Sequence, residues 1–170
     1  ATNTIYTNHR VNTTMTNHGK GPQKLISHRG NIRGRNPGLE NWPGYIVSAL
    51  REGYDVEIDV WEVDGNIYLG HDRPIYEVAC TFLTIPGLWC HFKTPSLCER
   101  FEGDTHMNYF VHDSEDSVLT SRGYRIYHPK ALQSEITSKA VAMCPEQRND
   151  KVLDLAGFYG ICSDNIIEYG

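Results

Sequence analysis

The chain has 170 residues, 39% of them hydrophobic, and a formal net charge of −5. This size and composition predict one globular domain, because domains of about 150 residues bury enough surface to be stable alone. The sequence shows neither a basic stripe suited to nucleic acid nor a run of about 18 apolar residues suited to a membrane span. We therefore expect no nucleic acid partner and no membrane span. The sequence carries no signal for a particular oligomeric state.

The first 22 residues are rich in Asn and Thr and lack periodic apolar positions. We interpret residues 1–22 as a flexible polar extension and residues 23–170 as the folded domain. The extension also lacks the apolar core of a secretory signal. The five cysteines are odd in number, and no pair has the Cys-x-x-Cys spacing of a zinc knuckle. Reduced thiols in a cytoplasmic protein are our main expectation, and a single disulfide is the alternative.

From Lys24 onward, short β-rich apolar runs alternate with polar or helical segments. The candidate strands are Lys24–His28, Tyr54–Trp61, Leu88–Lys93, Tyr109–Asp113, Tyr124–His128, Ala140–Cys144 and Tyr159–Ser163. This rhythm is typical of βα units and a mainly parallel sheet. A complete (β/α)₈ barrel usually takes about 250 residues. The expected α/β fold is therefore a TIM-barrel-like fold, shortened to about seven strands, with an open doubly wound sheet as the alternative.

The segment between the first two strands carries the clearest helix signals. Asn41 is the expected cap, and Pro43 suits the first turn. Gly53 suits the end of the helix, where a positive φ is needed.

Two further turns are predicted from local signals. Asp64-Gly65 predicts a β-hairpin inserted after the second strand, with Ile67–Leu69 as the returning strand. Ser114 is expected to cap a helix over Glu115–Arg122.

Two acidic residues stand two positions apart on the expected second strand. Side chains alternate along a strand, so Glu57 and Asp59 project to one face and the apolar Val56, Ile58 and Val60 to the other. In a barrel wrapped by helices, the apolar set faces the helices and the carboxylates point into the barrel. Two buried carboxylates at close range need a compensating charge, and such oxygen ligands suit Mg²⁺ or Ca²⁺.

Basic residues occur near the ends of the neighbouring candidate strands. His91 and Lys93 share one face of their strand, His28 ends the first strand just before Arg29, and His71 follows the hairpin. If these strands are neighbours, the side chains converge into a set that can bind phosphate and transfer protons. Taken singly, each residue also fits a solvated strand face or a turn contact, so a generic α/β domain with coincidental motifs is an alternative.

The order of these motifs resembles the N-terminal signature of the glycerophosphodiester phosphodiesterase family. The resemblance spans about residues 25–72 and continues more weakly at Lys93 and at Ser163-Asp164-Asn165. The matching segments are Ser27-His28-Arg29-Gly30, Glu40-Asn41, Val56-Glu57-Ile58-Asp59-Val60, Asp64-Gly65 and His71-Asp72.

The resemblance implies a TIM barrel that hydrolyses a small-molecule phosphodiester, such as glycerophosphocholine, to an alcohol and glycerol phosphate. In the route proposed for the family, a glycerol hydroxyl attacks phosphorus and water later opens the cyclic intermediate. By motif, the implied roles are general acid and base for His28 and His71, metal ligands for Glu57 and Asp59, phosphate binding for Arg29 and Lys93, and supporting positions for Glu40, Asn41 and Asp72.

The chain departs from this pattern at His91, which stands where the family has its third acidic metal ligand. An imidazole can bind a divalent metal but removes one negative charge, which tilts the site from Mg²⁺ or Ca²⁺ toward Mn²⁺ or Zn²⁺. A catalytically inactive phosphate- or metal-binding module is therefore the alternative function. The spider-venom type of phospholipase D shares the arrangement, but the length and cysteine content do not favour it. Further residues at or just after strand ends that could join the site are His112, Asp113, His128 and Glu146.

Overall fold

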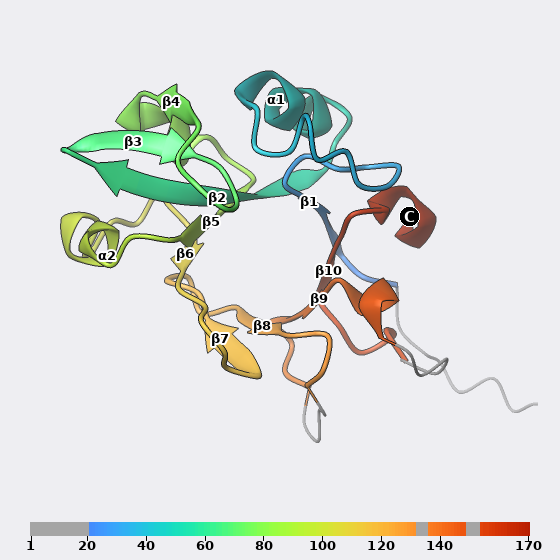
Figure 1. Ribbon diagram of the computed structural model, residues 1–170. Helices are drawn as coiled ribbons and strands as arrows, with labels where there is room; N and C mark the ends of the chain where they lie inside the picture. The colour runs from blue at the N-terminus through green and yellow to red at the C-terminus, as the bar shows by residue number, and fades with distance from the viewer. Residues whose placement is uncertain (1–20, 132–135, 149–153) are drawn as a thin grey trace, which may run out of the picture.

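The structure, a computed structural model, describes residues 21–131, 136–148 and 154–170. These residues form a mixed α/β domain in which a curled sheet surrounds a central space, with short helices on its outside (Figure 1). Within these ranges, no helix has the length and apolar character needed to cross a membrane. Of the polar extension expected over residues 1–22, all but the last two residues lie outside the described ranges.

The strands and helices of the described residues confirm most of the predicted order. Each of the seven predicted strands is present, with ends that shift by a few residues. In chain order the elements are β1 Lys24–His28, α1 Pro43–Arg51, β2 Asp55–Val63, β3 Asn66–Leu69, β4 Tyr76–Val78, β5 Leu88–Phe92, α2 Ser96–Arg100, β6 Tyr109–Phe110, β7 Ser117–Leu119, β8 Arg125–Tyr127, β9 Ala140–Met143 and β10 Gly160–Ser163, with 3₁₀ helices at Cys80–Thr84, Pro145–Gln147 and Ile166–Tyr169.

The parallel strands follow chain order around the curl. The first strand, β1, pairs with both β2 and the last strand, β10. Beyond β2 come β5 and β6, and beyond β10 come β9 and β8, all parallel. A doubly wound sheet reverses its order at a switch point, whereas this sheet forms a partial barrel. Among the described residues no strand ladder joins β6 to β7 or β8, although Ser121 N donates to Tyr109 O at 2.7 Å.

The helix predicted over Glu115–Arg122 is wrong. Ser117–Leu119 instead forms β7, which pairs antiparallel with β8. The chain reverses at Gly123, whose φ is 81°, and Thr120 N donates to Tyr124 O at 2.8 Å. Local helix preference is a weak signal, and here pairing with β8 overrides it.

The hairpin after β2 is confirmed. Asp64 and Gly65 both have positive φ, at 51° and 80°, as the two central residues of a type I′ turn require. β3 returns antiparallel to β2, and β4 adds a further antiparallel strand.

The helix α1 is present, but its predicted cap is not. Trp42 occupies the cap position, and Asn41 has a left-handed φ of 63°. Gly53 follows the helix with a φ of 96°, as predicted. The side-chain amide of Asn41 instead hydrogen-bonds to Asp59.

The curl of the sheet separates two apolar layers. Outside it, Val56, Ile58 and Val60 belong to the core cluster that includes the α1 residues Ile46 and Ala49, so the predicted outward face of β2 is confirmed. Inside the curl, a second cluster fills the space beneath the carboxyl ends of the strands, and its buried members are Ile26, Trp89, Phe110, Ile126, Val141 and Cys162.

Candidate active site

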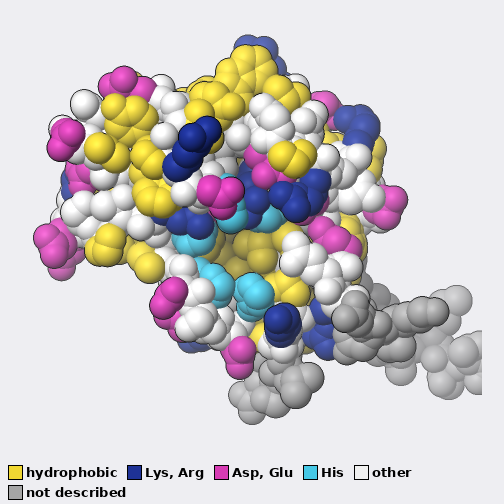
Figure 2. Space-filling view, in the orientation of Figure 1, with side chains coloured by type: hydrophobic (Ala, Val, Ile, Leu, Met, Phe, Trp, Pro, Cys, Tyr) yellow, Lys and Arg dark blue, Asp and Glu magenta, His cyan; other side chains and the backbone are white. Residues whose placement is uncertain are grey.

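A cavity of about 440 Å³ opens at the carboxyl ends of the parallel strands. Histidine and cationic side chains gather around this hollow, and apolar atoms form its floor (Figure 2). All parallel strands of a barrel end at the same rim, so residues far apart in the chain meet there. The predicted site residues that line the cavity are His28, Arg29, Glu57, Asp59, His71, His91 and Lys93.

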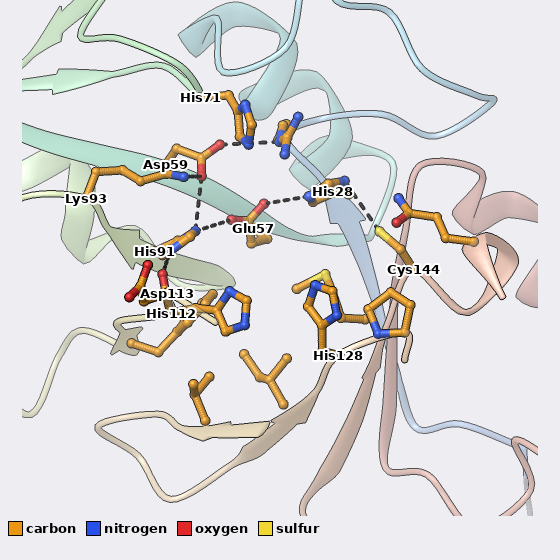
Figure 3. A pocket seen from close by; sticks show the side chains of 17 residues that line it. His28, Glu57, Asp59, His71, His91, Lys93, His112, Asp113, His128 and Cys144 are labelled. Carbon is orange, nitrogen blue, oxygen red and sulfur yellow. Dashed lines mark hydrogen bonds and ion pairs between the residues drawn. The ribbon is translucent and has the colours of Figure 1, made fainter. Parts of the chain in front are cut away.

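The register of β1, β2 and β5 brings two carboxylates between two imidazoles. In the ladders, His28 is paired with Glu57 and Asp59 with His91. His28 Nε2 lies 3.6 Å from Glu57 Oε2, and His91 Nδ1 lies 3.2 Å from Asp59 Oδ1 (Figure 3). The ligand atoms of Glu57, Asp59 and His91 all lie within 4.8 Å of one another. This set can hold a divalent cation.

The two carboxylates are buried with oxygen atoms left unsatisfied. Glu57 is 2% exposed and Asp59 1%. Glu57 Oε2 and Asp59 Oδ1 accept no hydrogen bond, and their polar neighbours are the ion-pair partners at 3.2 Å or more. Burial and the charge of Asp59 raise the pKa of Glu57. Burial opposes the charge on Asp59, but His91, Arg29 and Lys93 together hold the pKa of Asp59 well below its usual value. A bound cation would satisfy both orphaned oxygens, so the donor set fits a metal.

Two cations stand beside Asp59 at the cavity wall. Arg29 Nε lies 3.3 Å from Asp59 Oδ2, and Lys93 Nζ lies 3.5 Å from Asp59 Oδ1. Arg29 also donates from Nη1 to Glu40 Oε2 at 3.1 Å, which fixes its guanidinium. With Arg29 held in this way and Lys93 ending at the cavity, the pair can bind the oxygens of a phosphate.

Asn41 orients Asp59 from behind. Its Nδ2 donates to Asp59 Oδ2 at 2.9 Å, and Asp59 N donates to Asn41 Oδ1 at 2.9 Å. Asn41 is fully buried, and these two bonds satisfy both the NH₂ group and the oxygen of its side-chain amide. The motif predicts a supporting role for Asn41, and these two hydrogen bonds are the contacts through which it can orient Asp59.

His28 is held on its far side by residues that the sequence prediction did not place in the site. Its Nδ1 donates to Asp164 Oδ1 at 2.8 Å, and Cys144 Sγ lies 3.6 Å from the same nitrogen. Burial alone would lower the pKa of His28, but Asp164, Cys144 and Glu57 raise it well above its usual value. Asp164 directly follows the predicted strand Tyr159–Ser163, and Cys144 is the last residue of the predicted strand Ala140–Cys144. Their place at the carboxyl ends of these strands was the signal that could have included them.

His71 lies on the loop after β3, at the outer part of the cavity. Its side chain is 40% exposed, and its Nδ1 lies 2.8 Å from Asp72 Oδ1. Burial and the charges of Arg29 and Lys93 lower the pKa of His71. Asp72 itself is exposed and does not line the cavity, so it contacts the site only through His71.

The wall opposite β2 carries a second pair of imidazoles. His112 and His128 stack with their ring centroids 5.0 Å apart, and both line the cavity with Asp113. Burial and the neighbouring His112 lower the pKa of His128. Glu146 does not line the cavity; its Oε1 accepts from Ser163 Oγ and Asp164 N, which fixes the end of β10.

Comparison of the chain with protein-family models, with curated proteins and with solved structures finds no match in any of the three. The motif residues and the geometry of this cavity are therefore the features of the chain that indicate its function.

Proposed function

We propose that this chain is a metal-dependent phosphodiesterase that hydrolyses glycerophosphodiesters to an alcohol and glycerol phosphate. The observation that carries the proposal is the meeting of Glu57, Asp59 and His91 with two cations and two further imidazoles in one cavity. A cation pocket beside anion-binding side chains and proton donors is the set of groups that phosphodiester cleavage uses.

The fold proposed for this function is a shortened TIM barrel. Two features support it: the parallel strands follow chain order around the curl, and β1 pairs with β10. The cavity also opens at the carboxyl ends of the strands, where TIM-barrel enzymes carry their active sites.

The buried carboxylates would hold the metal, and the cations would hold the substrate. Glu57, Asp59 and His91 would ligate the ion, which supplies positive charge against the phosphate oxygens. Arg29 and Lys93 would bind the phosphate oxygens directly. His91 in place of a third carboxylate favours Mn²⁺ or Zn²⁺ more than an all-oxygen site does, while Mg²⁺ and Ca²⁺ suit the two acids.

The pKa values of His28 and His71 are shifted in opposite directions, as a general acid and a general base require. The contact with Asp164 helps to raise the pKa of His28, which favours its protonated form, whereas burial and the charges of Arg29 and Lys93 lower the pKa of His71, which favours its neutral form. We assign His71 as the base that accepts the proton of the attacking glycerol hydroxyl. His28 is then the acid that protonates the leaving alcohol oxygen as the phosphorus–oxygen bond breaks. In the second half-reaction the roles reverse, and water opens the cyclic phosphate.

The test is hydrolysis of glycerophosphocholine and of bis-p-nitrophenyl phosphate with added Mg²⁺, Ca²⁺ or Mn²⁺. His28→Ala and His71→Ala are each expected to lower turnover about 10²- to 10⁴-fold, the usual contribution of a general acid or base. His106→Ala, an exposed histidine outside the cavity, is the matched control. Activity that survives both cavity substitutions would refute the assignment.

The presence of His91 in place of a third acidic ligand favours a second candidate function, a catalytically inactive module that binds metal or phosphate. In that case calorimetry would detect binding of Mn²⁺ or inorganic phosphate, with no turnover of either substrate. Metal-dependent turnover that Glu57→Gln abolishes excludes this candidate.

A further inference from the structure

His28 has a second cluster of metal-ligating groups on the side away from Glu57. Its Nε2 faces Glu57, while its Nδ1 faces Asp164 and Cys144. The ligand atoms of His28, Cys144 and Asp164 lie within 4.8 Å of one another. The catalytic proposal uses Asp164 to hold His28 and leaves the thiol of Cys144 without a role.

We propose that Cys144, His28 and Asp164 form a second metal site that takes a thiophilic divalent cation, with Zn²⁺ the best fit. Thiolate and imidazole ligands favour Zn²⁺ over Mg²⁺ and Ca²⁺. The cluster of Glu57, Asp59 and His91 has two carboxylates and no thiolate, so it selects Zn²⁺ over the harder ions less strongly than this second cluster does.

The distances are close to those of a tetrahedral zinc site. Zinc bonds of about 2.0–2.3 Å separate neighbouring ligand atoms by roughly 3.4–3.7 Å. The distance from Cys144 Sγ to His28 Nδ1 is already 3.6 Å. The distance from His28 Nδ1 to Asp164 Oδ1 is 2.8 Å. To reach the ligand spacing of a zinc site, the Asp164 carboxylate has to move away from His28 Nδ1 by less than about 1 Å.

The surroundings favour a site with three protein ligands and one open position. Cys144 and Asp164 are buried, and Asn31 Nδ2 donates to Asp164 Oδ1 at 2.8 Å. Cys144 and His28 both line the main cavity (Figure 3). An ion can therefore enter from the cavity, and a water molecule can complete its shell. Binding releases the Nδ1 proton of His28 and the thiol proton of Cys144 to solvent.

This site would switch off hydrolysis. An ion on Nδ1 replaces the proton that Asp164 holds there, so His28 becomes a neutral imidazole ligand that keeps only its Nε2 proton. That proton is a much weaker acid than the proton of an imidazolium, so protonation of the leaving alcohol slows. This inhibition rests on the proposed function, but binding of the ion does not.

The binding test uses the full chain with excess Mg²⁺ to occupy the harder site. Co²⁺ is expected to give one equivalent of a thiolate-to-cobalt charge-transfer band that Zn²⁺ displaces. The band should disappear in Cys144→Ala and persist in Cys80→Ser, a cysteine outside the cavity. A band that is absent from the native chain, or that persists in Cys144→Ala, overturns the proposal.

A second measurement needs no variant. X-ray absorption of the native chain with one equivalent of Zn²⁺ is expected to show one sulfur at about 2.3 Å and nitrogen or oxygen at about 2.0–2.2 Å. A shell with no sulfur, or with more than one, contradicts the ligand set.

The inhibition test compares each protein with its own Mg²⁺-supported rate. Cys144→Ala is expected to need at least about 10-fold more Zn²⁺ than the native chain for half inhibition. Equal sensitivity overturns the inhibitory role. If the native chain hydrolyses no phosphodiester but shows the cobalt band, the proposed function fails and the second metal site stands.

Discussion

His28 Nδ1 lies 2.8 Å from Asp164 Oδ1, although the two residues are 136 positions apart in the chain. β1 and β10 are neighbours in the sheet, so the residue that ends one strand meets the residue that follows the other. The carboxylate stabilises the imidazolium and helps to raise the pKa of His28.

Asp164→Asn tests this pairing through the pH dependence of hydrolysis. His28 acts as the acid, so activity falls as pH rises through its pKa, and the raised pKa places this fall above the usual histidine value of about 6.5. Loss of the carboxylate charge lowers that pKa, and the basic limb of kcat/KM should move down by about 1 pH unit. Asp154→Asn, at an exposed aspartate, is the control. An unmoved basic limb would contradict the role of Asp164.

Glu57→Gln should stabilise the metal-free protein. The pKa of Glu57 is raised by folding, so its ionisation costs stability as pH rises above the value of about 4.5 in the unfolded chain. A neutral amide removes that cost at pH 7. The native chain should gain about 2.7 kcal/mol from a metal at 100 times its Kd, and the variant little. Thermal unfolding with and without Mn²⁺ measures both effects, with the exposed Glu77→Gln as control. A metal-induced rise in Tm equal to the native one would show that Glu57 is not a ligand.

Asn41→Ala should weaken metal binding without removing a ligand. Two hydrogen bonds from Asn41 orient Asp59, and loss of such support typically lowers metal affinity about 10- to 100-fold. Turnover should recover at high metal concentration, which distinguishes this variant from Glu57→Gln. Asn66→Ala, an exposed residue on β3, is the matched control. A metal requirement identical to that of the native chain would mean that Asp59 needs no support.

His91→Glu should change which metal supports activity. A third carboxylate restores one negative charge, so the ratio of the Mg²⁺-supported rate to the Mn²⁺-supported rate should rise. Without metal, three acids at close range repel one another, and Tm should fall. His91 also stacks on Phe110 with ring centroids 4.9 Å apart, so His91→Gln serves as the control for loss of that contact. An unchanged metal preference in the variant would place His91 outside the ligand set.

Gly30→Ala should destabilise the turn that presents Arg29. Gly30 has a φ of 95°, and an added Cβ would lie 2.6 Å from Tyr45 Cδ1. We expect a loss of about 1–3 kcal/mol from backbone strain and the clash together. Gly34→Ala separates the two, because Gly34 has a φ of 107° but nothing within 4 Å of its added Cβ. Denaturant unfolding measures both variants, and equal losses would mean that contact with Tyr45 contributes nothing.

The sequence by itself determined the parallel strands, the hairpin after β2 and the faces of β2. The alternation of β2 placed Glu57 and Asp59 on the face opposite Val56, Ile58 and Val60, because side-chain direction in a strand follows from position alone. The hairpin at Asp64-Gly65 followed from the positive φ values that its turn requires. These features depend on neighbours within a few residues.

Only the tertiary structure decided which distant residues meet. Residues 117–119 pair with β8 as a strand, in place of the helix expected over Glu115–Arg122. Asn41 hydrogen-bonds to Asp59 and does not cap α1. The neighbourhood of β9, β10 and β1 brought Cys144 and Asp164 to His28. The order and register of parallel strands are set by packing across the whole sheet, so no local pattern in the sequence carries them.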